Sequence, residues 1–178
     1  MASIQPLPDL WLLSDERNDA VLDARLRSFR EPVGFVYRHY HLPPEARRAR
    51  FDALAAIARQ RGHCVILADS TQTAREWGAH GVYGAPHAVY PTRRDLVSIA
   101  TAHDMREIAQ ANRIGADAVM LSPVFPTRSH PGANGLGPAR FRTLAAHAQM
   151  PVIALGGMNA ERAAELGWNR WAAIDGLS

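Results

Sequence analysis

Short apolar runs alternate with amphipathic stretches along almost the whole chain. The clearest amphipathic stretch opens with Pro43 and Pro44 and places Phe51, Leu54 and Ala58 on one face of a helix. Short strands that alternate with helices pair in parallel, and the helices cover the sheet. We therefore expect an α/β protein. The strand candidates are residues 9–13, 33–37, 64–67, 81–83, 96–100, 118–121, 152–155 and 171–174.

These eight candidates match the number of strands that closes a parallel sheet into a barrel. We predict a compact (β/α)8 TIM barrel that forms a single domain over residues 1–178. Such barrels typically have about 250 residues, so the connections here must be short, above all between the fourth and fifth strands. The alternative is an open doubly wound sheet, which needs fewer strands.

Composition excludes several kinds of chemistry and partner. The chain has 20 basic residues, and all of them are arginine, which excludes a Schiff-base lysine. Arg47, Arg48, Arg50, Arg59 and Arg61 fall on one predicted helix. Because no aromatic residues alternate with them, we expect a solvated helix face and no nucleic-acid partner.

No apolar run approaches the roughly 20 residues of a membrane-spanning helix, so we expect no membrane partner. The first residues lack the basic and apolar regions of a secretory signal. Cys64 is the only cysteine, which excludes a disulfide within the chain. Together these features predict a cytoplasmic protein, and they leave a homo-oligomer open.

Polar side chains recur where the predicted strands end. In a barrel the carboxyl ends of the strands and the loops after them build the site, so we expect these side chains to meet. They are Asp15, Arg38, Asp69, Tyr83, His103, the segment 122–130, Gly156 with Gly157, and Asp175.

Gly156 and Gly157 form the strongest local signal. They follow the apolar strand 152–155 and precede a helix that begins near Asn159. Glycine lets backbone N–H groups approach an anion closely, and a helix N-terminus favours negative charge. Because phosphate sites of these barrels lie after the seventh and eighth strands, we predict that this turn binds a small phosphorylated substrate. The alternative is a tight turn with no ligand.

The loop of residues 123–137 is rich in glycine and proline, and it contains Thr127, Arg128, Ser129 and His130. Clustered hydrogen-bond donors on a rigid loop suit a clamp over a phosphate. We therefore predict that Thr127 and Ser129 bind phosphate. A long surface connection is the alternative.

Three further side chains are candidates for the site. Asp69 ends a predicted buried strand, where its carboxylate would hold Mg²⁺ or cap the next helix. The guanidinium of Arg38 would clamp a diphosphate or form a salt bridge at the rim. His103 lies just beyond the fifth predicted strand, where an imidazole can transfer a proton. The histidines lack the spacing of a zinc site.

The second half of the chain carries motifs of a known superfamily. They are Gly115-Ala-Asp-Ala-Val-Met-Leu-Ser-Pro-Val-Phe-Pro-Thr127, Gly135-Leu-Gly137 and Pro151-Val-Ile-Ala-Leu-Gly-Gly-Met158. These segments resemble the thiamine-phosphate synthase and TenI superfamily. Weaker matches at residues 10–15 and 78–82 extend the resemblance over most of the chain.

The resemblance implies a transferase that joins a hydroxymethylpyrimidine diphosphate to a thiazole phosphate, releases pyrophosphate and uses Mg²⁺. It also implies that Arg38 contacts the diphosphate and that Asp69 binds the metal. Such a reaction needs cations and phosphate donors more than a nucleophile. The expected site is Arg38, His103 and His130 for catalysis, Thr127, Ser129, Gly156 and Gly157 for the phosphorylated substrate, and Asp69 for Mg²⁺.

The chain departs from the family pattern around the diphosphate. The residues that flank Asp69 differ from the usual asparagine and arginine, and no carboxylate follows the fourth predicted strand before Asp95. His130 stands where the family has a lysine, and Pro123 stands where its tautomerases have a histidine. Two alternatives therefore stay open. One is an isomerase in which His103 or His130 moves protons, and the other is a paralogue that binds a thiazole or thiamine phosphate without turnover.

Overall fold

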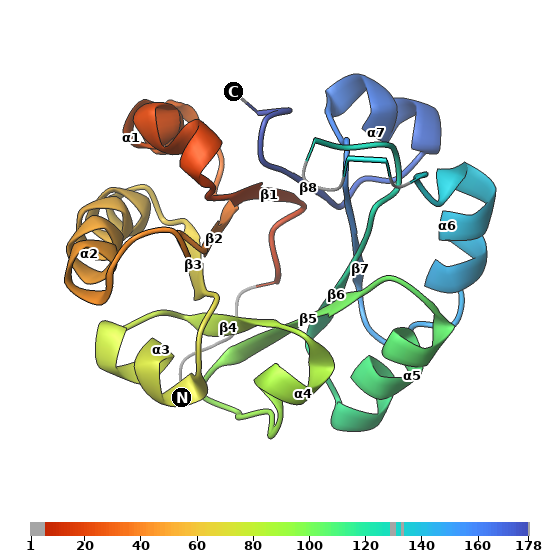
Figure 1. The fold of residues 1–178 in the computed structure, drawn as a ribbon, viewed down its shortest axis with the longest axis horizontal. Coiled ribbons are helices and arrows are strands. Elements are labelled where there is room, and N and C mark those ends of the chain that lie inside the picture. The colour runs from red at the N-terminus through yellow and green to blue at the C-terminus, as the bar shows by residue number, and fades with distance from the viewer. Residues whose placement is uncertain (1–5, 129–130, 133, 178) are drawn as a thin grey trace.

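The computed structural model describes residues 6–128, 131–132 and 134–177. Within them, eight parallel strands close into a barrel in chain order, and α-helices surround it (Figure 1). The last strand pairs with the first, Trp11 beside Ala172, so no edge of the sheet is left open. The predicted (β/α)8 barrel is confirmed, and the open doubly wound sheet is excluded.

The elements follow one another with short connections. In chain order they are β1 (Leu10–Leu13), η1 (Glu16–Asn18), α1 (Asp19–Ser28), β2 (Gly34–Tyr37), α2 (Pro44–Gln60), β3 (Cys64–Leu67), α3 (Thr71–Trp77), β4 (Gly81–Gly84), α4 (Pro86–Val89), β5 (Val97–Ala102), α5 (Met105–Ile114), β6 (Ala118–Leu121), α6 (Gly137–Ala145), β7 (Val152–Leu155), α7 (Ala160–Leu166) and β8 (Trp171–Ala173).

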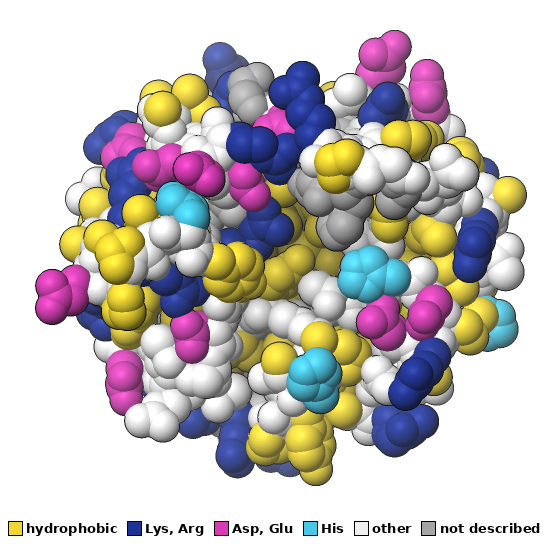
Figure 2. Space-filling model, viewed as in Figure 1, with side chains coloured by type: hydrophobic (Ala, Val, Ile, Leu, Met, Phe, Trp, Pro, Cys, Tyr) yellow, Lys and Arg dark blue, Asp and Glu magenta, His cyan; other side chains and the backbone are white. Residues whose placement is uncertain are grey.

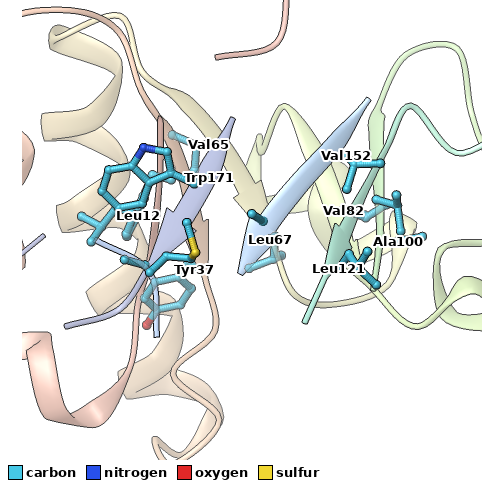
Figure 3. Packing of buried hydrophobic residues seen from close by; sticks show 14 of the residues in the cluster. Leu12, Tyr37, Val65, Leu67, Val82, Ala100, Leu121, Val152 and Trp171 are labelled. Carbon is cyan, nitrogen blue, oxygen red and sulfur yellow. The ribbon is translucent and has the colours of Figure 1, made fainter. Parts of the chain in front are cut away.

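The strands are apolar along their length because each has two buried faces. In β1, Trp11 and Leu13 belong to the cluster that fills the barrel, whereas Leu12 belongs to the cluster between barrel and helices. Figure 3 shows part of this outer cluster, with Leu67 and Leu121 contributed by two other strands. The alternation of the two sets along each strand fixes which side chains can reach the interior.

Two predicted boundaries were wrong. We expected the fifth strand at residues 96–100, but β5 extends to Ala102, which brings His103 directly to the rim of the barrel. The sequence of residues 138–149 is typical of one helix, but α6 ends at Ala145. The residue before a proline avoids helical geometry, so no helix here could include Met150, which precedes Pro151.

Local sequence signals set the starts of several helices. Asp104 caps α5, because its side chain accepts a hydrogen bond from the backbone N–H of Glu107. The expected short connection between the fourth and fifth strands consists of residues 85–96, which include the four residues of α4. Among the described residues, none of the helices is long and apolar enough to cross a membrane.

Candidate functional site

A pocket of about 140 Å³ opens at the carboxyl ends of the strands. The space-filling view shows a hollow near the middle of this face, enclosed by the ring of helices (Figure 2). Segments that follow β2, β5, β6, β7 and β8 reach it, together with Tyr83 near the end of β4, as expected for a barrel site. Its lining includes Arg38, Tyr83, Thr101, His103, Thr127 and the turns at 155–158 and 173–176.

Most of the predicted site residues meet in this pocket. Arg38, His103, Thr127, Gly156 and Gly157 all line it. Their roles stay predictions, because no ligand is present to test them. Asp69 is not part of the lining. Ser129 and His130 lie outside the described residues.

The turn after β7 is held by the β6–α6 loop (residues 122–136). The carbonyls of Leu155 and Gly156 accept hydrogen bonds from the N–H groups of Val124 and Phe125, at 2.9 and 3.1 Å. In a trans peptide the C=O and the following N–H point in opposite directions. The N–H of Gly157 therefore points away from this loop.

The next peptide of the turn is oriented in the same way. The carbonyl of Gly157 accepts a hydrogen bond from the guanidinium of Arg162. The N–H of Met158, in the same peptide, therefore points away from Arg162. Gly156 and Gly157 have φ values of +102° and +61°, which glycine adopts readily and other residues rarely. Consecutive N–H groups arranged in this way form a concave site for an anion.

A second glycine turn lies against the first. A Cβ on Gly176, just after β8, would lie 2.0 Å from the carbonyl oxygen of Met158, so only glycine fits there. Within the described part of the chain, the N–H groups of Gly157, Met158 and Gly176 donate no hydrogen bond. All three residues line the pocket. We refer to these three N–H groups as the backbone cradle, and their unused donors suit an oxyanion such as phosphate.

The predicted contribution of a helix N-terminus is smaller than expected. The helix after the turn, α7, has only seven residues, and the side chain of Asn159 already accepts a hydrogen bond from the backbone N–H of Arg162. The anion-binding capacity of this corner therefore comes from the glycine turns.

Arg38 is fixed at the pocket by the end of β1. Its Nε donates to the carbonyl of Ser14 at 2.9 Å, and its Nη2 donates to Asp15 at 2.8 Å. Burial raises the pKa of Asp15, but hydrogen bonds and charge from Arg17 and Arg38 outweigh it, so the pKa lies below its ordinary value. Arg38 thus forms the predicted salt bridge at the rim and lines the pocket as well.

A buried hydrogen-bonded chain holds the backbone of Arg38. Its N–H donates to Ser14 Oγ at 2.7 Å, and Ser14 Oγ lies 2.8 Å from Nδ1 of His39. Nε2 of His39 lies 2.8 Å from the carboxylate of Asp19. Because a carboxylate only accepts, a neutral His39 donates from Nε2 and accepts the Ser14 hydroxyl at Nδ1. Burial lowers the pKa of His39, which favours this neutral form.

His103 is paired with a carboxylate at the edge of the pocket. Its Nδ1 lies 2.8 Å from Oε2 of Glu107, and the same oxygen accepts the His103 backbone N–H at 2.6 Å. The pairing uses Nδ1 and orients the ring, so that Nε2 is the nitrogen that can exchange a proton with a ligand. Tyr83 also lines the pocket, and burial raises its pKa to about 12, so it is present as a neutral phenol.

Asp69 does not form a magnesium site by itself. Its Oδ2 accepts from Arg47 at 2.6 Å and its Oδ1 from the backbone N–H of Ser70 at 2.7 Å. Burial raises its pKa, but these contacts outweigh burial and the pKa lies below its ordinary value. Mg²⁺ is held by several oxygen ligands, and the described residues contain no group of three or more acidic, histidine or cysteine side chains that could hold a metal. Among the described residues Asp69 has no second carboxylate beside it for a metal, and the binding of Mg²⁺ stays a prediction.

The alternative prediction for Asp69, a helix cap, is wrong in detail. The side chain of Ser70 caps α3, since its hydroxyl accepts from the backbone N–H of Thr73 at 3.0 Å. The side chain of Asp69 instead accepts hydrogen bonds from the backbone N–H of Ser70 and from the guanidinium of Arg47.

Sequence reasoning missed three residues of this region: Arg47, Arg162 and Gly176. Gly176 had a usable signal, since it follows the last strand where phosphate sites of barrels lie. The two arginines had none, because nothing local in the sequence indicates which carbonyl or carboxylate a long side chain will reach.

The chain is similar to known proteins over most of its length. A family model described as "Thiamine monophosphate synthase" matches residues 14–177. The chain is 32% identical over 167 residues to the thiamine-phosphate synthase of Chlorobium luteolum, covering 89% of this chain and 78% of that protein. It is 31% identical over 157 residues to the thiamine-phosphate synthase of Thioalkalivibrio sulfidiphilus, covering 83% and 71%.

Solved structures show the same fold. A thiamine phosphate pyrophosphorylase from Pyrococcus furiosus superposes with a TM-score of 0.75 over 93% of this chain and 84% of that one. The two sequences are 21% identical, so this likeness concerns the fold alone.

Proposed function

Because the chain belongs to the thiamine monophosphate synthase family, we propose that it joins a thiazole phosphate to a pyrimidine carried on a diphosphate and releases pyrophosphate. The observation that carries the proposal is the backbone cradle of Gly157, Met158 and Gly176, which opens into the same pocket as Arg38. A cradle of neutral donors suits the phosphate that stays on the thiazole. The guanidinium of Arg38 suits the diphosphate that leaves.

The proposed reaction needs no proton transfer. The thiazole nitrogen uses its lone pair to form a bond with the methylene carbon of the pyrimidine. The bond from that carbon to the diphosphate oxygen breaks, and the diphosphate departs with the electron pair. The protein must therefore align the two substrates and stabilise the charge that develops on the leaving group.

The residues of the pocket supply both requirements. Holding the thiazole phosphate at the cradle fixes the distance and angle of attack. The described contacts of Arg38 with Ser14 and Asp15 use its Nε and Nη2, and the guanidinium carries further N–H groups that can contact a diphosphate. Asp15 lowers the net charge near Arg38, so binding of the diphosphate is expected to weaken that salt bridge.

A second candidate function is an isomerase that acts on the same thiazole phosphate. The pairing of His103 with Glu107 at the edge of the pocket favours it. An imidazole oriented by a carboxylate is a typical general base. In this case the cradle would hold the phosphate while His103 takes a proton from one ring position and returns it at another.

The first experiment varies the ligand, so that no variant has to fold. We expect thiazole phosphate to bind at least about tenfold more tightly than the corresponding thiazole alcohol, because the alcohol lacks the group that the cradle binds. Isothermal titration calorimetry measures both affinities. Equal affinities would contradict a phosphate site in this pocket.

The second part of the experiment separates the two reactions. The protein is incubated with both substrates, with and without Mg²⁺, and thiamine phosphate is measured by mass spectrometry. Product formation supports the transferase. Without product, uptake of solvent deuterium into the bound thiazole phosphate, lost in His103→Gln, would replace the transferase by the isomerase. Binding without either reaction would leave a phosphate-binding paralogue and contradict both enzymatic functions.

A further inference from the structure

Three consecutive carbonyls in the turn after β7 are held by hydrogen bonds, and one of the three donors is a side chain. Backbone N–H groups hold the carbonyls of Leu155 and Gly156. The carbonyl of Gly157 is held by the guanidinium of Arg162, from the first turn of α7. Only this third contact depends on the identity of a side chain.

The guanidinium of Arg162 is itself fixed by an aromatic ring. It lies over Phe125, with its central carbon 5.0 Å from the ring centroid. A Cβ on Gly157 would lie 3.0 Å from Nη1 of Arg162 and 2.7 Å from the carbonyl oxygen of Pro126. Arg162 is therefore packed between the turn and the β6–α6 loop, and connects them.

The contact decides the direction of one peptide. Glycine has access to more backbone conformations than any other residue, so the conformation of Gly157 does not by itself fix the orientation of the peptide between Gly157 and Met158. In one orientation the carbonyl faces the pocket and repels an anion. A hydrogen bond from Arg162 to that carbonyl selects the other orientation, in which the N–H of Met158 faces the pocket.

Arg162 and Arg38 differ in their ion pairs among the described residues. Arg38, at the other part of the pocket, pairs with Asp15 at 2.8 Å. Within the described residues, Arg162 forms no ion pair, although Glu161 and Glu165 lie on the same helix. The guanidinium of Arg162 contacts Gly157, which belongs to the cradle. Its positive charge therefore raises the electrostatic potential that a phosphate meets there.

We propose that Arg162 is a positioning residue for phosphate recognition: it orients the peptide that supplies the Met158 N–H and adds the positive charge of the site. This inference rests on the proposed function of the pocket as a phosphate site. Arg162 does not line the pocket, yet by this inference it contributes to the selectivity for phosphorylated ligands.

The test compares three variants of Arg162 with the same two ligands, thiazole phosphate and thiazole alcohol. We expect Arg162→Ala to weaken binding of the phosphate about tenfold or more, since charge-assisted hydrogen bonds contribute at this level, and to leave binding of the alcohol unchanged. Arg162→Lys keeps the charge and should recover part of the loss. Arg162→Gln keeps a donor but no charge, so its affinity should depend less on salt than that of the wild type.

Arg142→Ala is the matched control. Arg142 also donates from its guanidinium to a backbone carbonyl, that of Leu166 at the far end of α7. Its loss should lower the midpoint of thermal unfolding to a similar extent as Arg162→Ala, without changing the ratio of the two affinities.

The outcomes are distinguishable. If the wild type does not prefer the phosphate, the proposed function fails and this inference fails with it. If the wild type prefers the phosphate and Arg162→Ala keeps the full preference, only this inference is overturned. Equal weakening of both ligands in Arg162→Ala would also overturn it, because that pattern indicates a purely structural role.

Discussion

At the scale of single residues, the hydrogen-bond partners of a buried histidine determine which of its two ring nitrogens carries the proton. His63 is 2% exposed, and its Nδ1 accepts the backbone N–H of Val33 at 3.1 Å. An accepting nitrogen carries no proton, so Nε2 is the donor to the carbonyl of Leu26 at 2.8 Å. Burial lowers the pKa of His63. His63 therefore stays neutral in the folded protein at pH values where a histidine in water takes up a proton.

This difference predicts a pH dependence of stability. The unfolded chain protonates His63 below its ordinary pKa of 6.5, and the folded protein does so only at lower pH. The free energy of unfolding should therefore fall as the pH decreases from above 6.5 toward the folded-state pKa, and should not change above that window through this residue. His63→Asn keeps an acceptor and removes the titration, so urea unfolding at pH 7.5 and 5.5 should show a smaller decrease.

The matched control is His147→Asn, because His147 is exposed. Its decrease between the two pH values should equal that of the wild type. A decrease in His63→Asn as large as in the wild type would contradict the assignment to His63.

At the scale of elements, the arginines of α2 connect the helix to its neighbours. The expected solvated face is found in part for Arg48, which is 40% exposed and pairs with Asp52 within the helix, but also lies over the ring of Trp77 on α3. It is wrong for Arg50, whose guanidinium binds Asp19 at 2.7 Å and Asp23 at 2.6 Å on α1. A helical pattern indicates which residues leave the apolar face, but the neighbouring helix decides whether they meet water or a carboxylate.

These two arginines allow a prediction within one helix. Arg50→Ala should lower the free energy of unfolding by about 1–2 kcal/mol, because it removes a partly exposed network with two carboxylates. Arg48→Ala removes one exposed pair and one exposed contact with the Trp77 ring, and should cost less, no more than about 1 kcal/mol. Urea unfolding of both variants measures the difference. Equal losses would show that the contact between α1 and α2 does not depend on Arg50.

At the scale of the whole molecule, the barrel interior is a packed core. Trp11 is fully buried within it, and its ring lies over Gly34 of the neighbouring strand. A Cβ on Gly34 would lie 2.1 Å from that ring. Because every strand pairs on both sides, a displacement of β2 would reach β1 and β3 together.

We therefore expect Gly34→Ala to lower the free energy of unfolding by about 2 kcal/mol or more, since overpacking a tight core has costs of this order. Gly84→Ala is the matched control in a strand, because its Cβ would lie 3.3 Å from that of Ala88, a much milder contact. Tryptophan fluorescence and circular dichroism should report the same urea transition for the wild type and both variants. A Gly34→Ala protein as stable as Gly84→Ala would contradict this account of the interior.

The order of elements, the closed barrel and the end of the barrel that carries the pocket could all be predicted from the amino-acid sequence. The physical reason is that burial on two faces requires continuous apolar runs, and parallel strands place all their carboxyl ends on one side. The glycines at 156 and 157 and the position of His103 followed from the same local pattern. Their functional assignments stay predictions.

The partners of the charged side chains, in contrast, depend on the folded arrangement of the chain. Asp69 and Arg47 lie 22 positions apart, and their contact removes Asp69 from the role that its place after a strand suggested. The carbonyl of Gly157 is bound by Arg162, and Gly176 lies against Met158 from another turn. A long flexible side chain can reach many partners, so its choice depends on which backbone groups and carboxylates the closed barrel places within reach.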